Sequence, residues 1–299
     1  MIKSNVSKPA LVKLLFISGI VILIFSSLSY WHIVYNSPGK VFSRMLKTSL
    51  STVSVTKVIS QADESQNLRQ AVVLRSQPKP LIRSISVLAQ GANGDTKVTT
   101  ESISTPLIDF VRYNDIQTNQ KNEAGSAFDF KDVVGVWGKT DDSDTSGNGA
   151  QLFNQTLLGV VPFANINKAQ RDQLLNQINK NGVYEIDTSK VKRQYVNARP
   201  IYTYEVTVRP VAYVTMLKAF AQANGLTQLD QVNPDQYTES SPLTFTFEVD
   251  ILSSQLTKII YSQGQRTETY GSYGARVAIN PPESSIPVGE LQTRLQKIR

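Results

Sequence analysis

A run of 18 uncharged, mostly apolar residues, from Leu14 to Trp31, constrains this chain more than any other stretch. Its length is close to the minimum that lets an α-helix cross a bilayer. Lys3, Lys8 and Lys13 precede it, and the cytoplasmic flank of a membrane helix is typically rich in lysine. The sequence therefore predicts a single-pass protein of the cell membrane, with its N-terminus in the cytoplasm and most of its chain extracytoplasmic.

A cleavable signal peptide is the alternative interpretation of this run. Ser27 and Ser29 are small enough for the −3 and −1 positions of a cleavage site. The bulky Tyr30 and Trp31 that follow such a cut, together with Tyr35, instead have the composition of an aromatic belt at a membrane interface. We therefore expect an anchor that is retained.

The 299 residues divide into four segments along this axis. We expect a short cytoplasmic tail (1–13), a transmembrane signal anchor (14–35), a membrane-proximal amphipathic helix with the first strand region (36–62) and an extracytoplasmic α+β domain (63–299). A hydrophobic content of 40% is enough for a proper core. Residues 36–299 are therefore expected to fold as one domain.

The stretch after the anchor has the pattern of an amphipathic helix. Ser37 and Pro38 suit an N-cap and a first helical position. Lys40, Arg44 and Lys47 share one helical face. They form either a basic stripe that contacts lipid phosphates or the solvent-exposed side of the first domain helix, and the second interpretation is favoured. The apolar residues of the opposite face are Val41, Phe42, Met45, Leu46, Leu50 and Val53.

Short strands separated by turn signals dominate the rest of the chain. The clearest one, LTFTFEVDIL (243–252), alternates apolar and polar residues throughout. The pattern predicts an α+β fold in which a curved, half-barrel-like antiparallel sheet has helices packed on one face. Further strands are expected at 68–75, 81–90, 96–104, 107–116, 128–137, 200–210, 255–262, 266–270 and 274–279, and helices at 167–182, at 212–224 and after Pro282.

Composition excludes several kinds of chemistry. The chain has no cysteine, and hence no disulfide, thiolate metal site or lipid-modified cysteine. Its one histidine, His32, lies at the membrane boundary, which rules out a histidine-dependent triad or zinc site in the domain. Glu248 and Asp250 share a strand face but are equally explained as outer polar residues. We expect a non-catalytic protein without a cofactor, and an envelope hydrolase is the weaker alternative.

The loop at 141–149 begins like a calcium-binding loop. Asp142, Asp144 and Ser146 occupy the first, third and fifth ligand positions. The twelfth position needs a bidentate glutamate and is Phe153 instead. We therefore expect a solvated acidic loop and no metal.

Aromatic and apolar side chains gather on one face of two later strands, because alternate residues of a strand point the same way. They either line a groove for an acyl chain or a sugar, or belong to the core, which is the commoner role of such a stripe. The candidate ligand-binding residues are Tyr202, Tyr204, Val206, Phe245 and Phe247.

The order of elements resembles the LolA/LppX-type lipoprotein-carrier superfamily. The resemblance is carried by the opening helix VFSRMLKTSLSTV, the strand YEVTV and the strand–turn–strand FEVDILSSQLTKII, and it spans 37–281. It implies a strongly curved antiparallel sheet that wraps around helices and leaves an apolar cavity for lipid. The chain departs from that family in having an anchor in place of a lipobox cysteine, and an added C-terminal helix. No residue of the family's site can be placed here.

The net charge of +7 is concentrated near the anchor, since no acidic residue precedes Asp63. This favours anionic lipid as a partner. Nucleic acid is not expected, because the domain has no basic cluster interleaved with aromatic residues. The predicted function is a membrane-anchored extracytoplasmic binding domain that accommodates a lipid or other apolar ligand. The alternative is a structural or assembly component of the cell envelope, or of a secretion machine, that acts through protein partners.

Overall fold

In the computed structural model, the structure is described for residues 20, 23, 34–63, 65–91, 95–122, 125–140, 150–226, 229–262 and 265–298. Apart from Ile20 and Leu23, the run predicted as an anchor lies outside this part. The calcium-like loop with Asp142, Asp144 and Ser146 also lies outside it. Within the described part, no helix combines the length and the apolar character needed to cross a membrane.

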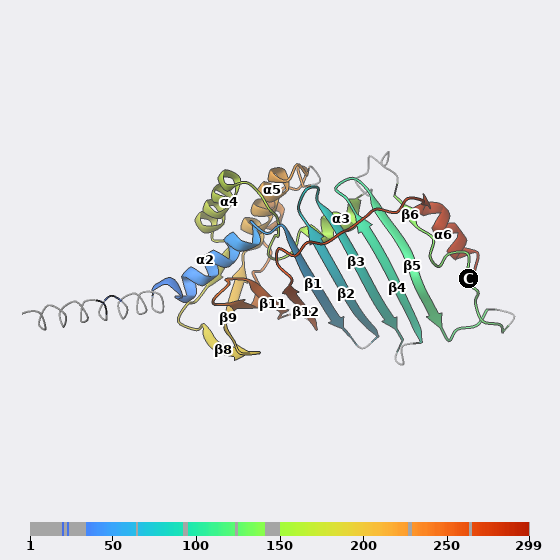
Figure 1. Ribbon diagram of the computed structural model, residues 1–299, viewed down its shortest axis with the longest axis horizontal. Coiled ribbons are helices and arrows are strands. Elements are labelled where there is room, and N and C mark those ends of the chain that lie inside the picture. Colours follow the sequence, from blue (N-terminus) through green and yellow to red (C-terminus); the bar gives the residue numbers. More distant parts are fainter. Residues whose placement is uncertain are drawn as a thin grey trace, which may run out of the picture.

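One large, open, curved sheet organises the fold (Figure 1). Its strands are β1 (Ser54–Ala62), β2 (Gln66–Arg75), β3 (Leu81–Gln90), β4 (Thr96–Ser104), β5 (Asp109–Thr118), β6 (Gly138–Lys139), β7 (Tyr184–Ile186), β8 (Lys192–Val196), β9 (Arg199–Val208), β10 (Leu243–Asp250), β11 (Leu256–Tyr261), β12 (Arg266–Gly271) and β13 (Ile286–Pro287). In the described residues their order in space is β13-β6-β5-β4-β3-β2-β1-β12-β11-β10-β9-β7, with β8 paired to β9. Only the β13–β6 pair is parallel among them. The predicted α+β class with a curved antiparallel sheet is confirmed.

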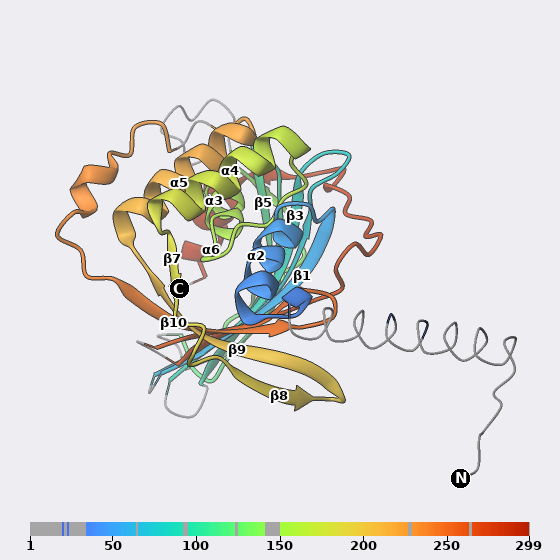
Figure 2. The same cartoon turned by 90° about the vertical axis from the view of Figure 1, so that its left-hand side faces the viewer.

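Helices cover one face of this sheet. They are α2 (Pro38–Ser49), α3 (Gln151–Leu157), α4 (Lys168–Asn181), α5 (Pro210–Ala223) and α6 (Val288–Gln296), with a short 3₁₀ helix η3 (Pro234–Tyr237). Helices α2 to α5 lie on the same side of the sheet, and α6 lies at its far edge (Figures 1 and 2). The four predicted helices are confirmed within a few residues, and α3 was not predicted.

Helix α2 packs into the curve of the sheet through its apolar face. Val41 and Met45 are fully buried, and Lys40 and Lys47 on the opposite side are exposed. The helix begins at Pro38. Proline suits this first position because its φ is already helical and because the backbone N–H that it lacks would have no partner within the helix. The buried residues thus recur at the helical spacing that predicted this helix from the sequence.

Helix α4 is delimited by residues that the sequence already marks. The side chain of Asn167 accepts a hydrogen bond from the backbone N–H of Gln170 at 3.0 Å. Gly182 ends the helix in the left-handed conformation, with φ +58°, which glycine adopts without steric cost. Leu174 and Ile178 are its buried residues and hold it in the main core.

The predicted strand at 274–279 is wrong. This stretch is irregular and belongs to a strap, residues 272–285, which crosses the face of the sheet opposite to α2–α5 (Figure 1). Ile279 of the strap is 3% exposed and packs in a second, small core with Leu81, Ile103 and Phe110. Its alternating apolar residues therefore reflect packing across the sheet and not pairing within it.

The predicted strand at 128–137 is also wrong. These residues form turns, with a single bridge between Val134 and Tyr113 and a hydrogen bond from Gly135 N to Tyr113 O at 2.8 Å. Gly135 has φ +82°, which breaks an extended conformation. The segment therefore runs along the edge of β5 as a loop, and only β6 at its end joins the sheet.

Candidate ligand-binding groove

The half of the sheet formed by β3–β5 carries a groove on its helix-covered side. Ile82 of β3 belongs to the main core and lies opposite Ser104 of β4. Alternate residues of β4 point the same way, so Val98 and Thr96 share this face with Ser104. Across the strand boundary, Val98 pairs with Ile116 of β5 and Thr96 pairs with Thr118.

A β-bulge decides which residues of β5 reach this floor. The register shifts between Thr99 and Thr100, so Thr99 pairs with Asp115 and Thr100 pairs with Tyr113. The extra residue, Asn114, rephases the alternation. Tyr113 and Ile116 are three positions apart, so in a regular strand they would lie on opposite faces. The bulge instead brings both of them to the groove.

Two other segments form the walls of the groove. Phe128 and Phe130 come from the loop along β5, with their ring centroids 6.0 Å apart. Leu295 comes from α6. That helix is held by Leu291, which is 2% exposed and packs so closely on Gly138 that an added Cβ at Gly138 would lie 2.9 Å from it. The C-terminal helix thus completes the site.

The groove has a volume of about 600 Å³, within the range typical of small-molecule sites. Its floor and walls are apolar and aromatic, and none of its lining residues is charged. Hydroxyl and amide groups stand at the rim, where the Thr96 and Thr118 hydroxyls are 3.0 Å apart. Such a lining suits an apolar or neutral amphipathic molecule, and none of the described lining residues carries a carboxylate, an amine or an imidazole. The lining residues are Gln90, Thr96, Val98, Tyr113, Ile116, Thr118, Gln120, Phe128, Phe130 and Leu295.

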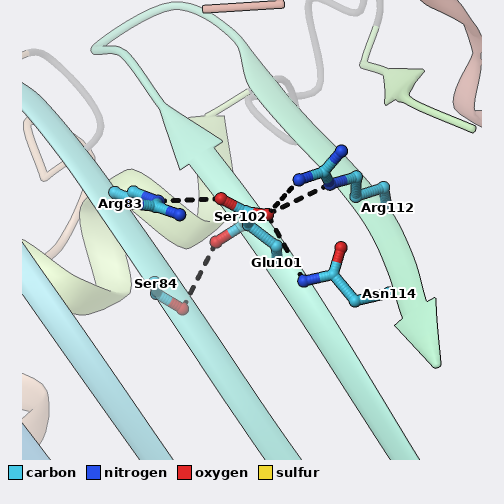
Figure 3. A network of polar contacts seen from close by, with 6 residues as sticks. All are labelled: Arg83, Ser84, Glu101, Ser102, Arg112 and Asn114. Carbon is cyan, nitrogen blue, oxygen red and sulfur yellow. Dashed lines mark hydrogen bonds and ion pairs between the residues drawn. The ribbon is translucent and has the colours of Figure 1, made fainter. Parts of the chain in front are cut away.

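On the opposite face of the same strands, a charged network supports β3, β4 and β5. Figure 3 shows Glu101 of β4 between Arg83 of β3 and Arg112 of β5. Arg83 Nε donates to one carboxylate oxygen at 2.7 Å, and Arg112 Nη2 donates to the other at 2.6 Å. Burial alone raises the pKa of Glu101, but the hydrogen bonds from Arg112, Arg83 and Asn114 outweigh it, and its pKa lies below the usual value.

Replacing Glu101 with alanine is expected to lower the free energy of unfolding by about 2 kcal/mol, because two charged donors lose their acceptor. Arg83 and Arg112 keep side-chain exposures of 44% and 33%, so water compensates part of the loss. Lys97→Ala changes an exposed residue of the same strand face and is the control, expected within about 0.5 kcal/mol of the wild type. Urea denaturation followed by circular dichroism measures both, and equal effects would show that the network adds no stability.

A second cluster of ionisable groups lies in the main core around Glu268 of β12, which has no exposed surface. One carboxylate oxygen accepts hydrogen bonds from Tyr261 at 2.7 Å and Arg266 at 2.6 Å. The other accepts from Tyr270 and lies 3.7 Å from Lys57 Nζ. Both oxygens are therefore occupied by the protein's own donors.

The cover over this cluster comes from the segment between α3 and α4. Tyr213 of α5 donates to Gly159 O at 2.8 Å, and Tyr184 donates to Val160 O at 2.7 Å. An added Cβ at Gly159 would lie 3.8 Å from Lys57 Nζ. The combination of lysine, glutamate and tyrosines resembles a catalytic set in composition, but its geometry is that of a closed structural network.

The predicted ligand-binding residues lie elsewhere, in the main core under α2. Tyr204, Val206 and Phe247 have no exposed surface, and Phe245 is 5% exposed. Phe42 of α2 packs on them, with its ring centroid 5.3 Å from that of Tyr204 and 6.2 Å from that of Phe247. Tyr202, which is half-buried, adjoins Tyr204.

The basic residues that the sequence predicted to lie near a membrane differ in their surroundings. Lys40 and Lys47 are exposed on α2. Arg44 donates from Nε to Ser254 Oγ at 3.0 Å, and its guanidinium group lies 3.9 Å from the ring centre of Tyr35. The structure therefore gives Arg44 a packing role that the sequence did not indicate.

The two carboxylates of β10 have different surroundings. Asp250 is 2% exposed and accepts hydrogen bonds from Leu252 N and Ser253 N, which closes the turn after the strand. Glu248 is half-buried and lies on the face of the sheet opposite to the core residue Phe247. They do not form a joint acid–base pair around a cavity.

Sequence reasoning missed the groove residues for a physical reason. Val98 follows the alternation of β4, but Ile116 reaches the same face only through the bulge in β5. Phe128, Phe130 and Leu295 meet them only through tertiary contacts. Among the described residues, no group of acidic or histidine side chains is placed to hold a metal ion. No protein-family model and no curated protein sequence matches this chain.

Proposed function

We propose that this protein is a membrane-anchored extracytoplasmic binding protein that holds an apolar or neutral amphipathic ligand, such as a lipid, in the groove over β4 and β5. The observation that carries the proposal is the groove itself. It combines a volume of about 600 Å³ with an aromatic floor and walls and an uncharged polar rim. An apolar body would contact Val98, Ile116 and the two phenylalanines, and a neutral polar head would meet the rim.

The position of the groove adds to this proposal. It lies at the end of the sheet beside α6, and the chain enters α2 at the opposite end (Figure 1). The apolar run Leu14–Trp31 precedes α2 and supports the anchoring part of the proposal. A protein arranged in this way presents its ligand away from the bilayer that holds it.

Ile116→Glu is the variant that tests the site. A carboxylate on the floor opposes an apolar ligand because its burial without a partner is costly, so probe affinity is expected to fall at least tenfold. Gln117→Glu introduces the same charge at the neighbouring exposed position and is the matched control. Titration of the full chain with the fluorescent apolar probe N-phenyl-1-naphthylamine gives both affinities, and native mass spectrometry detects any co-purified lipid.

The two variants separate the outcomes. Probe binding that Ile116→Glu abolishes and Gln117→Glu preserves supports the proposal. Wild-type protein that binds no probe and is reproducibly free of lipid overturns it. A stable protein partner captured by crosslinking at the groove in that case supports the assembly function instead.

A further inference from the structure

Exposed apolar and aromatic residues gather at the end of the molecule where α2 begins. Tyr195 is 67% exposed and Leu252 is 59% exposed. Tyr195 lies on the β8–β9 hairpin, which is at the same end of the molecule as the start of α2 (Figure 1). Leu252 lies on the turn after β10, and Ser254 of that turn accepts a hydrogen bond from Arg44 of α2. We define the base surface as Val34, Tyr35, Lys192, Arg193, Tyr195, Val196 and Leu252.

The hairpin that carries part of this surface is well defined. Its two-residue turn, Asn197–Ala198, has φ values of 50° and 62°, as a type I′ turn requires. Tyr195 pairs with Pro200 and Val196 pairs with Arg199 across the turn. Every residue of β8 is exposed, so this strand covers no core of its own. Among the described residues β8 pairs with β9 alone and contributes nothing to the core. Burial in the core therefore does not explain its apolar residues.

Contacts tie the three parts of the base surface into one unit. Ile251 N donates to Pro200 O at 3.0 Å, which joins the turn after β10 to the start of β9. Arg199 and Asp250 form an ion pair at 3.4 Å across the same junction. Tyr202 donates to Asn36 O at 2.9 Å and thereby links β9 to the residues that lead into α2. The surface is therefore built on rigid elements.

The charge of the base surface is positive. In the described part of the chain, Lys192 and Arg193 form no ion pair with an acidic side chain, whereas the nearby Asp187 is paired with Lys190 at 3.4 Å. Arg193 lies 5.8 Å from the ring centre of Tyr195. Tyrosine and aliphatic residues next to lysine and arginine are the composition that enters the headgroup region of anionic bilayers.

We propose that the base surface docks on the headgroup region of an anionic bilayer, with the β8–β9 hairpin and Leu252 in contact with lipid. The proposal rests on the anchoring part of the proposed function. The apolar run ends at Trp31, three residues before Val34, and an extended chain covers about 10 Å in that interval. The end of the anchor therefore holds this surface within reach of the bilayer. Docking fixes the orientation of the domain and directs the groove away from the membrane.

Site-specific fluorescence tests this contact directly, because the chain has no cysteine. Tyr195→Cys and Leu252→Cys each provide one site for an environment-sensitive nitrobenzoxadiazole label on the full-length protein. Leu107→Cys is the control, since Leu107 is 73% exposed on the β4–β5 turn in the far half of the sheet. The labelled proteins are reconstituted into vesicles of phosphatidylcholine and phosphatidylglycerol at 3:1, with and without lipids that carry a quencher near the headgroup.

We expect lipid quenching at positions 195 and 252 to exceed that at 107 several-fold. The difference should shrink in vesicles of phosphatidylcholine alone and in the charge-reversed variant Lys192→Glu/Arg193→Glu, whose substitutions are exposed and leave the core intact. If the protein is recovered together with the vesicles after flotation in a density gradient, but quenching is equal at all three positions, the docking is overturned and the anchor stands. If the protein is not recovered with the vesicles, both the anchor and the docking are overturned. A label at 195 that is shielded from water but not quenched by lipid would assign the surface to a protein contact and also overturn the proposal.

Discussion

Phe42→Ala is expected to lower the free energy of unfolding by about 3–5 kcal/mol, the usual cost of truncating a buried phenylalanine. Phe42 is 6% exposed and connects α2 to β7, β9 and β10, with ring contacts to Tyr184, Tyr204 and Phe247. The sheet is curved around this side chain, so the strands cannot collapse into the space that alanine leaves. Urea denaturation of the full-length protein in mild detergent, followed by circular dichroism, measures the loss.

The neighbouring residue supplies the control for this prediction. Ser43 is exposed on α2, so Ser43→Ala leaves the core unchanged and is expected to shift stability by no more than about 0.5 kcal/mol. A loss below about 1 kcal/mol for Phe42→Ala would contradict the prediction. It would mean that α2 is not needed to fill the curve of the sheet, and would reopen the interpretation of Tyr204 and Phe247 as a ligand-binding lining.

Glu268→Gln is expected to cost about 3–5 kcal/mol, because it leaves the buried ammonium group of Lys57 without a charged partner. Lys57 is 9% exposed, and burial lowers its pKa more than the nearby Glu268 raises it. Lys57→Met in the Glu268→Gln background removes that unpaired charge and is expected to restore most of the stability. A double-mutant cycle by urea denaturation gives the coupling between the two side chains. Additive losses would show that they do not act as a pair.

The pH dependence of stability provides a second test of the same network. Burial alone raises the pKa of Glu268, but Lys57, Tyr270, Tyr261 and Arg266 together hold it below its ordinary value of 4.5. A carboxyl whose pKa is lower in the folded state stabilises the fold above the unfolded pKa, and this contribution disappears as the pH falls through the folded pKa. The stability difference between wild type and Glu268→Gln is therefore expected to narrow as the pH falls below about 5. A difference that stays constant down to pH 2 would contradict this assignment.

Local sequence signals located most of the secondary structure correctly. The N-cap at Asn167 and the glycine at 182 delimit α4, and the strict alternation of 243–252 predicts β10. These signals depend only on residues a few positions apart, so they can be recognised without knowing the tertiary structure. The same local logic failed at 274–279, where the alternating apolar residues of the strap pack against Leu81 and Ile103 across the sheet.

Local sequence signals could not predict whether an apolar strand face belongs to the core or lines a cavity. Tyr204, Phe247 and their neighbours have the composition of a ligand-binding stripe, but Phe42, which lies about 160 and about 205 residues earlier in the sequence, packs on them. The groove has a similar composition at Val98 and Ile116, and there the described part of the chain leaves an open space above the floor. Whether an apolar face is filled depends on which distant element packs on it, and strand periodicity carries no information about that choice.

The sequence by itself determined the α+β class, the antiparallel strands, the helix boundaries and the absence of thiol and histidine chemistry in the domain. Each follows from residue identity or from a period of two or 3.6 residues, which the backbone imposes locally. Only the tertiary structure decided where the groove lies, because its floor needs the bulge at Asn114 and its walls need Phe128, Phe130 and Leu295 from separate segments. The same holds for the base surface, whose hairpin, turn and helix start are joined by contacts between residues more than a hundred positions apart.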